Sequence, residues 1–411
     1  MFGWEFPPVK SGGLGTVCFS LTRALAQKGI DITFVMPTGP KDIKGDFVNL
    51  IVANNVDYKH IKIKPIDSLL TPYLSFDDYS DLYKRIRKIR EDDTTAELYG
   101  KNLYHEVWRF AEIAKLIATN EEFDIIHCHD WMTVDAAINA KAISGRPIVM
   151  HIHNTAFDRG AGHANDYEYE IEKRGFDAAD RIIAVSHRVK DMVAGKYDID
   201  PNKIDVSHWG IDQDLPAYDM GYQSPLSNGN HIVLFLGRIT IQKGPDYLIE
   251  AAKKVLHYVP NTKFVFVGSG DMEGQIIKRV AELGIGKNVI FSGFMSGNDV
   301  HKAYQMADVF VMPSVSEPFG VVPLEAMRNN TPCVISKQSG VSEVLKNCLK
   351  IDFWDVDELA NKIVGVLKYK PLYRELQQKG MQEVRQLTYE ETADRVIDTY
   401  NKVFSMAYVY H

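Results

Sequence analysis

The stretch Glu317-Pro-Phe-Gly-Val-Val-Pro-Leu-Glu325 places two carboxylates a fixed distance apart. It follows an apolar run at residues 307–314 that is typical of a buried strand, and it leads into a predicted helix at residues 324–328. Both carboxylates can therefore face a crevice at the carboxyl end of a parallel sheet, where open α/β sheets bind ligands. A helix N-terminus beside them suits phosphate. The pattern indicates a ligand with both hydroxyls and phosphates, such as a nucleotide sugar.

Strand-like and helix-like patterns alternate along the whole chain, which is typical of α/β domains with parallel sheets. Residues 214–230 break the alternation, because they are polar and rich in Pro, Gly and Ser, as expected of a linker. We therefore predict two Rossmann-like, doubly wound domains that face a cleft, at residues 1–213 and 231–389. Residues 390–411 are predicted to form a C-terminal helix.

Composition limits the possible partners of the chain. Its 411 residues suit two domains of about 150 to 200 residues each. The net charge of −7 argues against a nucleic-acid partner, which usually requires a basic excess. Four scattered cysteines without a C-x-x-C pair indicate a reduced, cytoplasmic protein. No apolar run approaches about 18 residues, so stable membrane insertion is not expected.

Two glycine-containing loops of the second domain suggest a diphosphate site. In Gly237-Arg-Ile-Thr-Ile-Gln-Lys-Gly244, Arg238 and Lys243 are placed to clamp a diphosphate across the loop, although they could also be two solvated surface cations. Gly268-Ser-Gly-Asp271 follows another predicted strand. It either lines the nucleotide site or is only a strand-to-helix turn.

The first domain has its own glycine-rich turn, Lys10-Ser-Gly-Gly-Leu-Gly15. Gly12 and Gly13 would let the backbone approach a ligand and expose N–H groups at a helix start, and Lys10 could reach a phosphate. The turn matches neither the dinucleotide fingerprint nor a Walker A loop, so a simple tight turn stays possible. A strand is expected before it, but only about two to five residues are available, against a typical five or six.

Histidines end two short predicted strands, in His127-Cys-His-Asp-Trp131 and His151-Ile-His-Asn154. An H-x-H pair can bind metal, but no third ligand with suitable spacing is evident, and we predict no metal site. The histidines are better interpreted as groups that contact sugar hydroxyls or orient the backbone, and a purely structural role is equally open for each. We favour His153 for chemistry, because Asn154 and a polar loop at residues 158–160 follow it.

Together these motifs resemble glycosyltransferase family 4, whose members are retaining enzymes with the GT-B fold. The resemblance covers nearly the whole chain and rests on E-P-F-G-x-x-x-L-E-A-M, G-R-x-x-x-x-K-G and the S-G-G-L-G turn. Within the family, the chain is most similar to bacterial and archaeal glycogen or starch synthase-like members. Residues 2–8 and 127–131, the Lys10 turn and the His153-Asn154 pair support that similarity.

The resemblance implies roles for the predicted site residues. Glu317 would contact hydroxyls of the donor sugar and help to stabilise the oxocarbenium-like transition state, and Glu325 would bind the nucleotide ribose. Arg238 and Lys243 would neutralise the diphosphate leaving group. His153 would lie at the anomeric centre. Further donor-binding groups would be Lys10, Gly12, Gly13, Gly237, Gly268 and Gly320.

The resemblance also implies the reaction and its participants. The first domain would be the acceptor side, and the second would bind the nucleotide-sugar donor. The C-terminal helix would cross back to the first domain, and no metal or other cofactor would be required. The expected activity is transfer of glucose from ADP-glucose or UDP-glucose to an α-1,4-glucan. The nearest rival is a cell-surface polysaccharide transferase at the membrane face, for which the basic run at residues 84–90 is the candidate contact. A GT-B nucleotide-sugar epimerase and a non-catalytic nucleotide-sugar-binding protein are less favoured functions.

Overall fold

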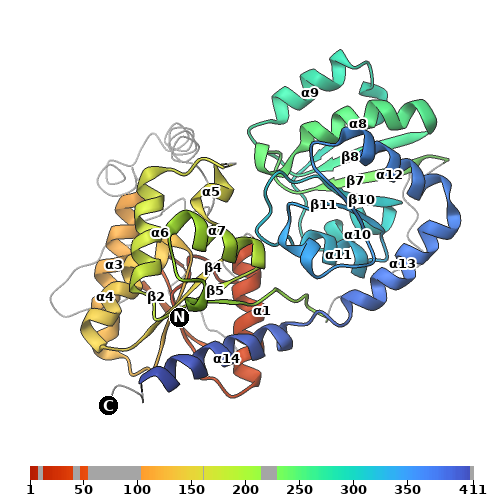
Figure 1. Cartoon of the computed structure of the whole chain (residues 1–411). Coiled ribbons are helices and arrows are strands. Elements are labelled where there is room, and N and C mark those ends of the chain that lie inside the picture. Colours follow the sequence, from red (N-terminus) through yellow and green to blue (C-terminus); the bar gives the residue numbers. More distant parts are fainter. Residues whose placement is uncertain (8–12, 40–46, 54–102, 161, 214–228, 408–411) are drawn as a thin grey trace.

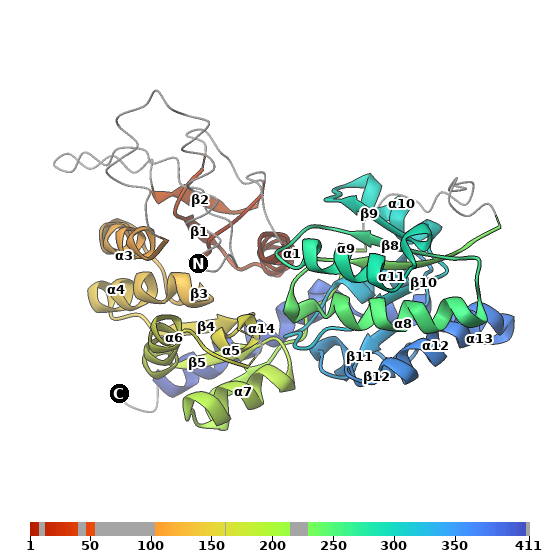
Figure 2. The same ribbon diagram turned by 90° about the horizontal axis from the view of Figure 1, so that it is seen from above.

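The computed structural model describes residues 1–7, 13–39, 47–53, 103–160, 162–213 and 229–407. It consists of two α/β domains, each built on a parallel sheet with helices on its faces (Figures 1 and 2). This confirms the predicted two-domain fold class. Lys10, Gly12, the basic run at residues 84–90 and most of the predicted linker lie outside the described residues.

The first-domain sheet is formed by two groups of parallel strands, ordered β1-β2 and β3-β4-β5-β6. Helix α3 packs closely on α4, and α4 packs on α6. The elements are α1 (Gly13–Gln27), β1 (Thr33–Met36), β2 (Asn49–Val52), α3 (Leu103–Asn120), β3 (Ile126–His129), α4 (Val134–Ser144), β4 (Ile148–Ile152), α5 (Ala156–Arg159), α6 (Asp166–Ala178), β5 (Arg181–Ala184), α7 (His187–Tyr197) and β6 (Ile204–Val206).

Phe2 joins the two groups of strands into one sheet. It forms parallel bridges to Val35 of β1 and to Cys128 of β3. Its N–H donates to the His127 carbonyl at 2.8 Å, and its own carbonyl accepts from the His129 N–H at 3.1 Å. The strand expected before the glycine-rich turn is therefore present as a single bridging residue at the centre of the sheet.

The second-domain sheet has six parallel strands in the order β12-β11-β10-β7-β8-β9. The chain runs outward from β7 in one direction and from β10 in the other, so the switch point lies between these two neighbours, and ligands bind at such a point. The elements are β7 (His231–Leu236), α8 (Pro245–Tyr258), β8 (Thr262–Val267), α9 (Glu273–Glu282), β9 (Val289–Gly293), α10 (Asn298–Met306), β10 (Val309–Met312), α11 (Val322–Arg328), β11 (Cys333–Ser336), η8 (Gly340–Glu343), β12 (Leu349–Ile351), α12 (Val356–Lys368) and α13 (Lys370–Val384).

The last helix, α14 (Tyr389–Ala407), leaves the second domain and packs on the first, as predicted (Figure 1). Its buried side chains recur at helical spacing and pack in one cluster with those of α1; they are Tyr389, Ala393, Val396, Tyr400 and Val403. No described helix combines the length and apolar character needed to span a bilayer.

Candidate active site

The loops after β7 and β10 meet at the switch point of the second domain. Lys243 Nζ lies 2.5 Å from Glu317 Oε2, and Ser314 Oγ donates to the same oxygen at 3.3 Å. Gly244 ends the turn that carries Lys243, with φ of +62°, and a Cβ there would lie 2.3 Å from the Pro313 carbonyl oxygen. Only glycine allows the two loops to approach this closely. The structure thus brings together a carboxylate and an ammonium that are far apart in the sequence.

The backbone of Glu317 is held by the loop after β11. Its N–H donates to the Gln338 carbonyl at 3.0 Å, and its carbonyl accepts from the Gly340 N–H at 2.9 Å. Gly320 has φ of +97°, and a Cβ there would lie 2.9 Å from Glu317 Cγ. The glycine of the Pro-Phe-Gly turn therefore makes room for the glutamate side chain itself.

The second glutamate of the motif, Glu325, lies in α11 and is partly buried. The buried Tyr304 hydroxyl donates to Glu325 Oε2 at 2.8 Å. Burial raises the pKa of the Glu325 carboxyl, and the Tyr304 hydrogen bond opposes that rise. Glu325 is thus oriented by α10 through Tyr304, a contact that the sequence analysis did not foresee.

Arg238 and the glycines around it form the edge of this site. The Arg238 side chain is exposed, and its Nη2 donates to Gln242 Oε1 at 3.3 Å. Gly237 and Gly268 directly follow the neighbouring strands β7 and β8, and a Cβ on Gly268 would lie 2.0 Å from the Gly237 carbonyl oxygen. Gly268 therefore has a packing role between two strand ends, beside the predicted nucleotide site.

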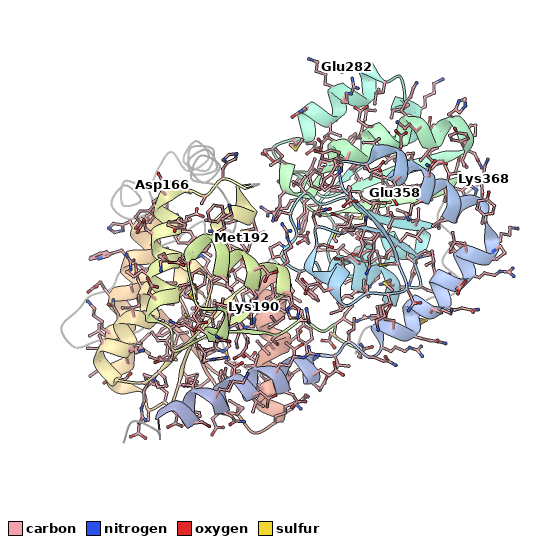
Figure 3. The ribbon with its side chains drawn as sticks, viewed as in Figure 1. Asp166, Lys190, Met192, Glu282, Glu358 and Lys368 are labelled. Carbon is pink, nitrogen blue, oxygen red and sulfur yellow. The ribbon has the colours of Figure 1, made fainter. Side chains whose placement is uncertain are left out.

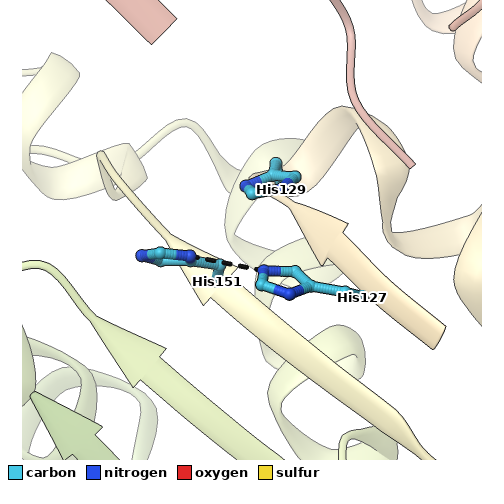
Figure 4. A group of neighbouring side chains, drawn as sticks. All are labelled: His127, His129 and His151. Carbon is cyan, nitrogen blue, oxygen red and sulfur yellow. Dashed lines mark hydrogen bonds between the residues drawn. The ribbon is translucent and has the colours of Figure 1, made fainter. Parts of the chain in front are cut away.

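Four histidines cluster at the carboxyl edge of the first-domain sheet, and Figure 4 shows three of them. His127 and His129 lie on β3, and His151 lies on β4 with His129 as its register partner. His127 Nε2 is 3.3 Å from His151 Nδ1, and His127 Nδ1 is 2.5 Å from the Tyr400 hydroxyl of α14. Burial lowers the pKa of each imidazole, that of His151 to about 3. All four rings are therefore neutral at physiological pH.

His153 is the fourth member of the cluster and follows β4. Its Nε2 lies 2.9 Å from His129 Nδ1, and its backbone N–H donates to Asp130 Oδ1 at 2.6 Å. Asp130 adopts φ of 58°, unusual for a residue other than glycine, and such positions gather at functional sites. Among the described atoms, His153 Nδ1 is buried without a hydrogen-bond partner.

Trp209 connects the two halves of the site. Its ring lies 5.2 Å from that of His153 and 5.6 Å from that of Phe319 in the Pro-Phe-Gly turn. His153 of the first domain and the loop at residues 317–320 of the second domain, which we call the glutamate loop, therefore contact the same indole. Gly13, by contrast, is exposed at the start of α1, and a Cβ there would have no described atom within 4 Å.

The histidine cluster also supplies the third candidate metal ligand that spacing alone did not reveal. Ring nitrogens of His127, His129 and His151 lie within 4.8 Å of one another. A metal ion would have to replace the hydrogen bond between His127 and His151. The absence of a metal requirement stays a prediction.

Phe294 is a further candidate that the sequence analysis missed. It follows Gly293 at the end of β9, and its side chain is 79% exposed. The Gly293 carbonyl accepts a hydrogen bond from the Gly268 N–H at 2.9 Å. Phe294 therefore comes directly after a residue that contacts the loop at residues 268–271, which is predicted to line the nucleotide site. An aromatic residue directly after a strand-ending glycine is the signal that could have identified it.

Comparison with known proteins identifies the family. Residues 1–201 match the starch synthase catalytic domain, and residues 222–383 match glycosyl transferases group 1. An uncharacterised glycosyltransferase of Methanocaldococcus jannaschii is 30% identical over 360 residues, covering 84% of this chain and 82% of that protein. The chain belongs to the glycosyltransferases. The chain is also 26% identical, over 300 residues, to an Escherichia coli α-1,3-galactosyltransferase named for a diphosphoundecaprenol-linked acceptor. The match covers 68% of this chain and 77% of the galactosyltransferase.

Solved structures agree with the fold. Sucrose-phosphate synthase from Thermosynechococcus elongatus superposes on the glycosyltransferase with a TM-score of 0.72, at 20% identity over 98% of both chains. The catalytic domain of starch synthase IV from Arabidopsis thaliana, bound to ADP and acarbose, gives 0.69 at 17% identity over 98% of both chains. The protein therefore has the GT-B fold.

Proposed function

We propose that this glycosyltransferase transfers glucose from ADP-glucose or UDP-glucose to an α-1,4-glucan with retention of configuration. The observation that carries the proposal is the Lys243–Glu317 pair at the switch point of the second domain, with Arg238 on the same loop as Lys243. The match of residues 1–201 to a starch synthase catalytic domain supports the glucan acceptor.

Charge stabilisation is the main task of the second-domain residues in this mechanism. As the bond between the sugar C1 and the phosphate oxygen breaks, negative charge develops on the diphosphate, and Lys243 and Arg238 stabilise it. Glu317 accepts hydrogen bonds from donor-sugar hydroxyls and favours the positive charge at C1. The acceptor hydroxyl attacks C1 on the same face, and its proton passes to the departing phosphate oxygen. No metal or cofactor takes part in these steps.

Binding and orientation fall to the remaining residues. The Glu325 carboxylate accepts hydrogen bonds from the ribose, and the exposed Phe294 ring offers a face on which a nucleobase can stack. His153 donates to or accepts from a sugar hydroxyl near the anomeric centre through its unsatisfied Nδ1. A neutral imidazole suits this role, because a cation there would repel the positive charge that develops at C1.

The second candidate is a transferase for a lipid-linked or cell-surface glycan. The similarity to the Escherichia coli galactosyltransferase favours it. The glucan hypothesis is preferred because the starch synthase match spans the first domain, which is the predicted acceptor side. No specific observation favours an epimerase or a non-catalytic binding protein.

A thermal-shift panel followed by a transfer assay tests the proposal. We expect ADP, UDP or their glucose conjugates to raise the melting temperature, because a ligand at about 100 times its Kd stabilises the folded state by about 2.7 kcal/mol. The stabilising glucose donor should then release nucleotide and label glycogen. Stabilisation by GDP-sugars or UDP-N-acetylglucosamine alone, with no transfer to glycogen, would contradict the glucan assignment.

A further inference from the structure

Glu343 of the second domain caps a helix of the first domain. One of its carboxylate oxygens accepts from the His187 backbone N–H and the other from that of Arg188, both at 2.8 Å. These N–H groups belong to the first turn of α7, where a helix has unpaired donors and a positive dipole end. His208 Nε2, near the start of the connection between the domains, adds a third contact to Glu343 Oε2 at 2.8 Å.

The electrostatics favour a charged Glu343 at this junction. Burial opposes ionisation, but hydrogen bonds from His208 and from the Arg188 and His187 N–H groups outweigh it, so the pKa of Glu343 lies below its ordinary value. All of the side-chain hydrogen bonds that the described structure gives Glu343 go to residues 187, 188 and 208. Its side chain therefore connects the domains and is not part of the second-domain core.

The same junction reaches the glutamate loop directly. Ser186 Oγ donates to the Pro318 carbonyl at 2.6 Å. Gly340, at the start of the η8 turn that carries Glu343, lies against both groups: a Cβ there would be 2.1 Å from the Pro318 carbonyl oxygen and 2.6 Å from Ser186 Cβ. The backbone after Glu317 is thus clamped between α7 and η8.

The residue before Glu317 is anchored to the first domain as well. Ser316 Oγ donates to Asp158 Oδ1 at 2.6 Å, and Arg188 Nη2 donates to Ser316 Oγ at 2.9 Å. Asp158 is itself fixed, because its other carboxylate oxygen accepts from the Thr155 hydroxyl at 2.8 Å. Both chain neighbours of Glu317 therefore bond to first-domain side chains, and the position of Glu317 depends on how the domains dock.

We propose that Glu343 is a positioning residue that latches the two domains together and thereby holds Glu317 in its reactive position against Lys243. The inference rests on the proposed transferase function, because it assigns Glu343 a part in that reaction. The latch consists of a few polar contacts across the junction, and domains joined in this way can open and close around a ligand. The latch makes the position of the Glu317 carboxylate depend on domain closure, although Glu343 itself does not contact the substrate.

Distance measurement tests the latch without any substrate. Asp166 of the first domain and Glu282 of the second are exposed and lie on separate domains (Figure 3), and the four native cysteines are buried. Spin labels on Asp166→Cys and Glu282→Cys therefore report the separation of the domains by double electron–electron resonance. We expect Glu343→Ala to shift and broaden the distance distribution, and Glu343→Gln to do so less. A distribution unchanged from that of the parent protein would overturn the latch.

A matched glutamate provides the control. Glu375 is exposed and pairs with Lys379 within α13. Glu375→Ala should leave the distance distribution unchanged. A broadening equal to that of Glu343→Ala would mean that the distribution follows general loss of charge, and it would also overturn the latch.

Kinetics test the positioning role. With the donor that the wild-type enzyme uses, Glu343→Ala should lower kcat by about tenfold while the Kd for ADP or UDP stays close to wild type. The melting temperature should fall only by the small amount expected for loss of one helix cap, whereas a folding defect would also weaken nucleotide binding. Unchanged kcat despite a widened distribution would overturn the link to Glu317. If the wild type turns over no nucleotide sugar, the proposed function fails, and the distance distribution still decides whether the latch exists.

Discussion

The carboxyl edge of the first-domain sheet carries four buried, neutral imidazoles, whereas that of the second-domain sheet carries Lys243 paired with Glu317. The difference follows from burial and pairing. Burial lowers the pKa of the packed imidazoles, so they stay unprotonated, whereas the partly exposed Lys243 ammonium is paired with the Glu317 carboxylate. The two edges therefore suit different tasks. The first-domain edge, with its four imidazoles, is the neutral edge and can bind sugar hydroxyls. The second-domain edge, with Lys243 and Glu317, is the charged edge and can stabilise a diphosphate.

Removing the ammonium of the charged edge should have the largest effect. We expect Lys243→Ala to lower kcat by roughly 10²- to 10³-fold, because loss of one stabilising group at a developing charge typically costs about 2.7–4 kcal/mol. Released nucleotide gives the rate. Lys253→Ala is the matched control, since Lys253 is an exposed lysine of α8 whose Nζ donates to the Leu283 carbonyl. Near-normal turnover by Lys243→Ala would remove Lys243 from the mechanism.

The sequence predicted much of the fold because each domain repeats a simple pattern. The apolar runs at residues 232–236, 263–267 and 309–312 form most or all of β7, β8 and β10. Buried parallel strands are short apolar runs between turns, so local composition identifies them. The bridging role of Phe2 was not predictable, since it depends on two partner strands that are distant in the chain.

The candidate site was predictable only as a set of residue types at strand ends. The pairing of Lys243 with Glu317 joins residues 74 positions apart, and the hydrogen bond of Tyr304 to Glu325 spans two helices. The histidine cluster arises because the register places His129 opposite His151, which sequence spacing does not determine. The sequence therefore indicated the chemistry of each edge but not which groups touch.

The neutral edge should be revealed by the pH dependence of stability. An imidazole whose pKa is lowered by folding binds fewer protons in the native state, so stability is full above the ordinary pKa near 6.5 and falls as pH decreases below it. His151, with a pKa of about 3, should contribute a slope of about 1.4 kcal/mol per pH unit between these values. Urea unfolding at pH 7.5, 6.0 and 5.0 measures it.

Replacing one ring sharpens this test. His151→Gln should reduce the slope below pH 6.5 by about 1.4 kcal/mol per pH unit, whereas His257→Gln, at the end of α8, provides the matched control. If His151→Gln has the wild-type slope, folding does not lower the pKa of His151, and the distinction between a neutral and a charged edge fails.

The smallest expected effect lies at the ribose end of the charged edge, where Tyr304 bonds to Glu325. Tyr304→Phe removes one hydrogen bond, so the Kd for ADP or UDP should rise by roughly twofold to tenfold, or about 0.5–1.5 kcal/mol. Because that bond opposes the rise in the pKa of Glu325, its loss raises the pKa further. The affinity deficit of the variant relative to the wild type should therefore grow as the pH falls from 8 to 6 in calorimetric titrations. Tyr258→Phe, at an exposed tyrosine, is the control. A deficit independent of pH would show that Glu325 does not bind ribose as a carboxylate.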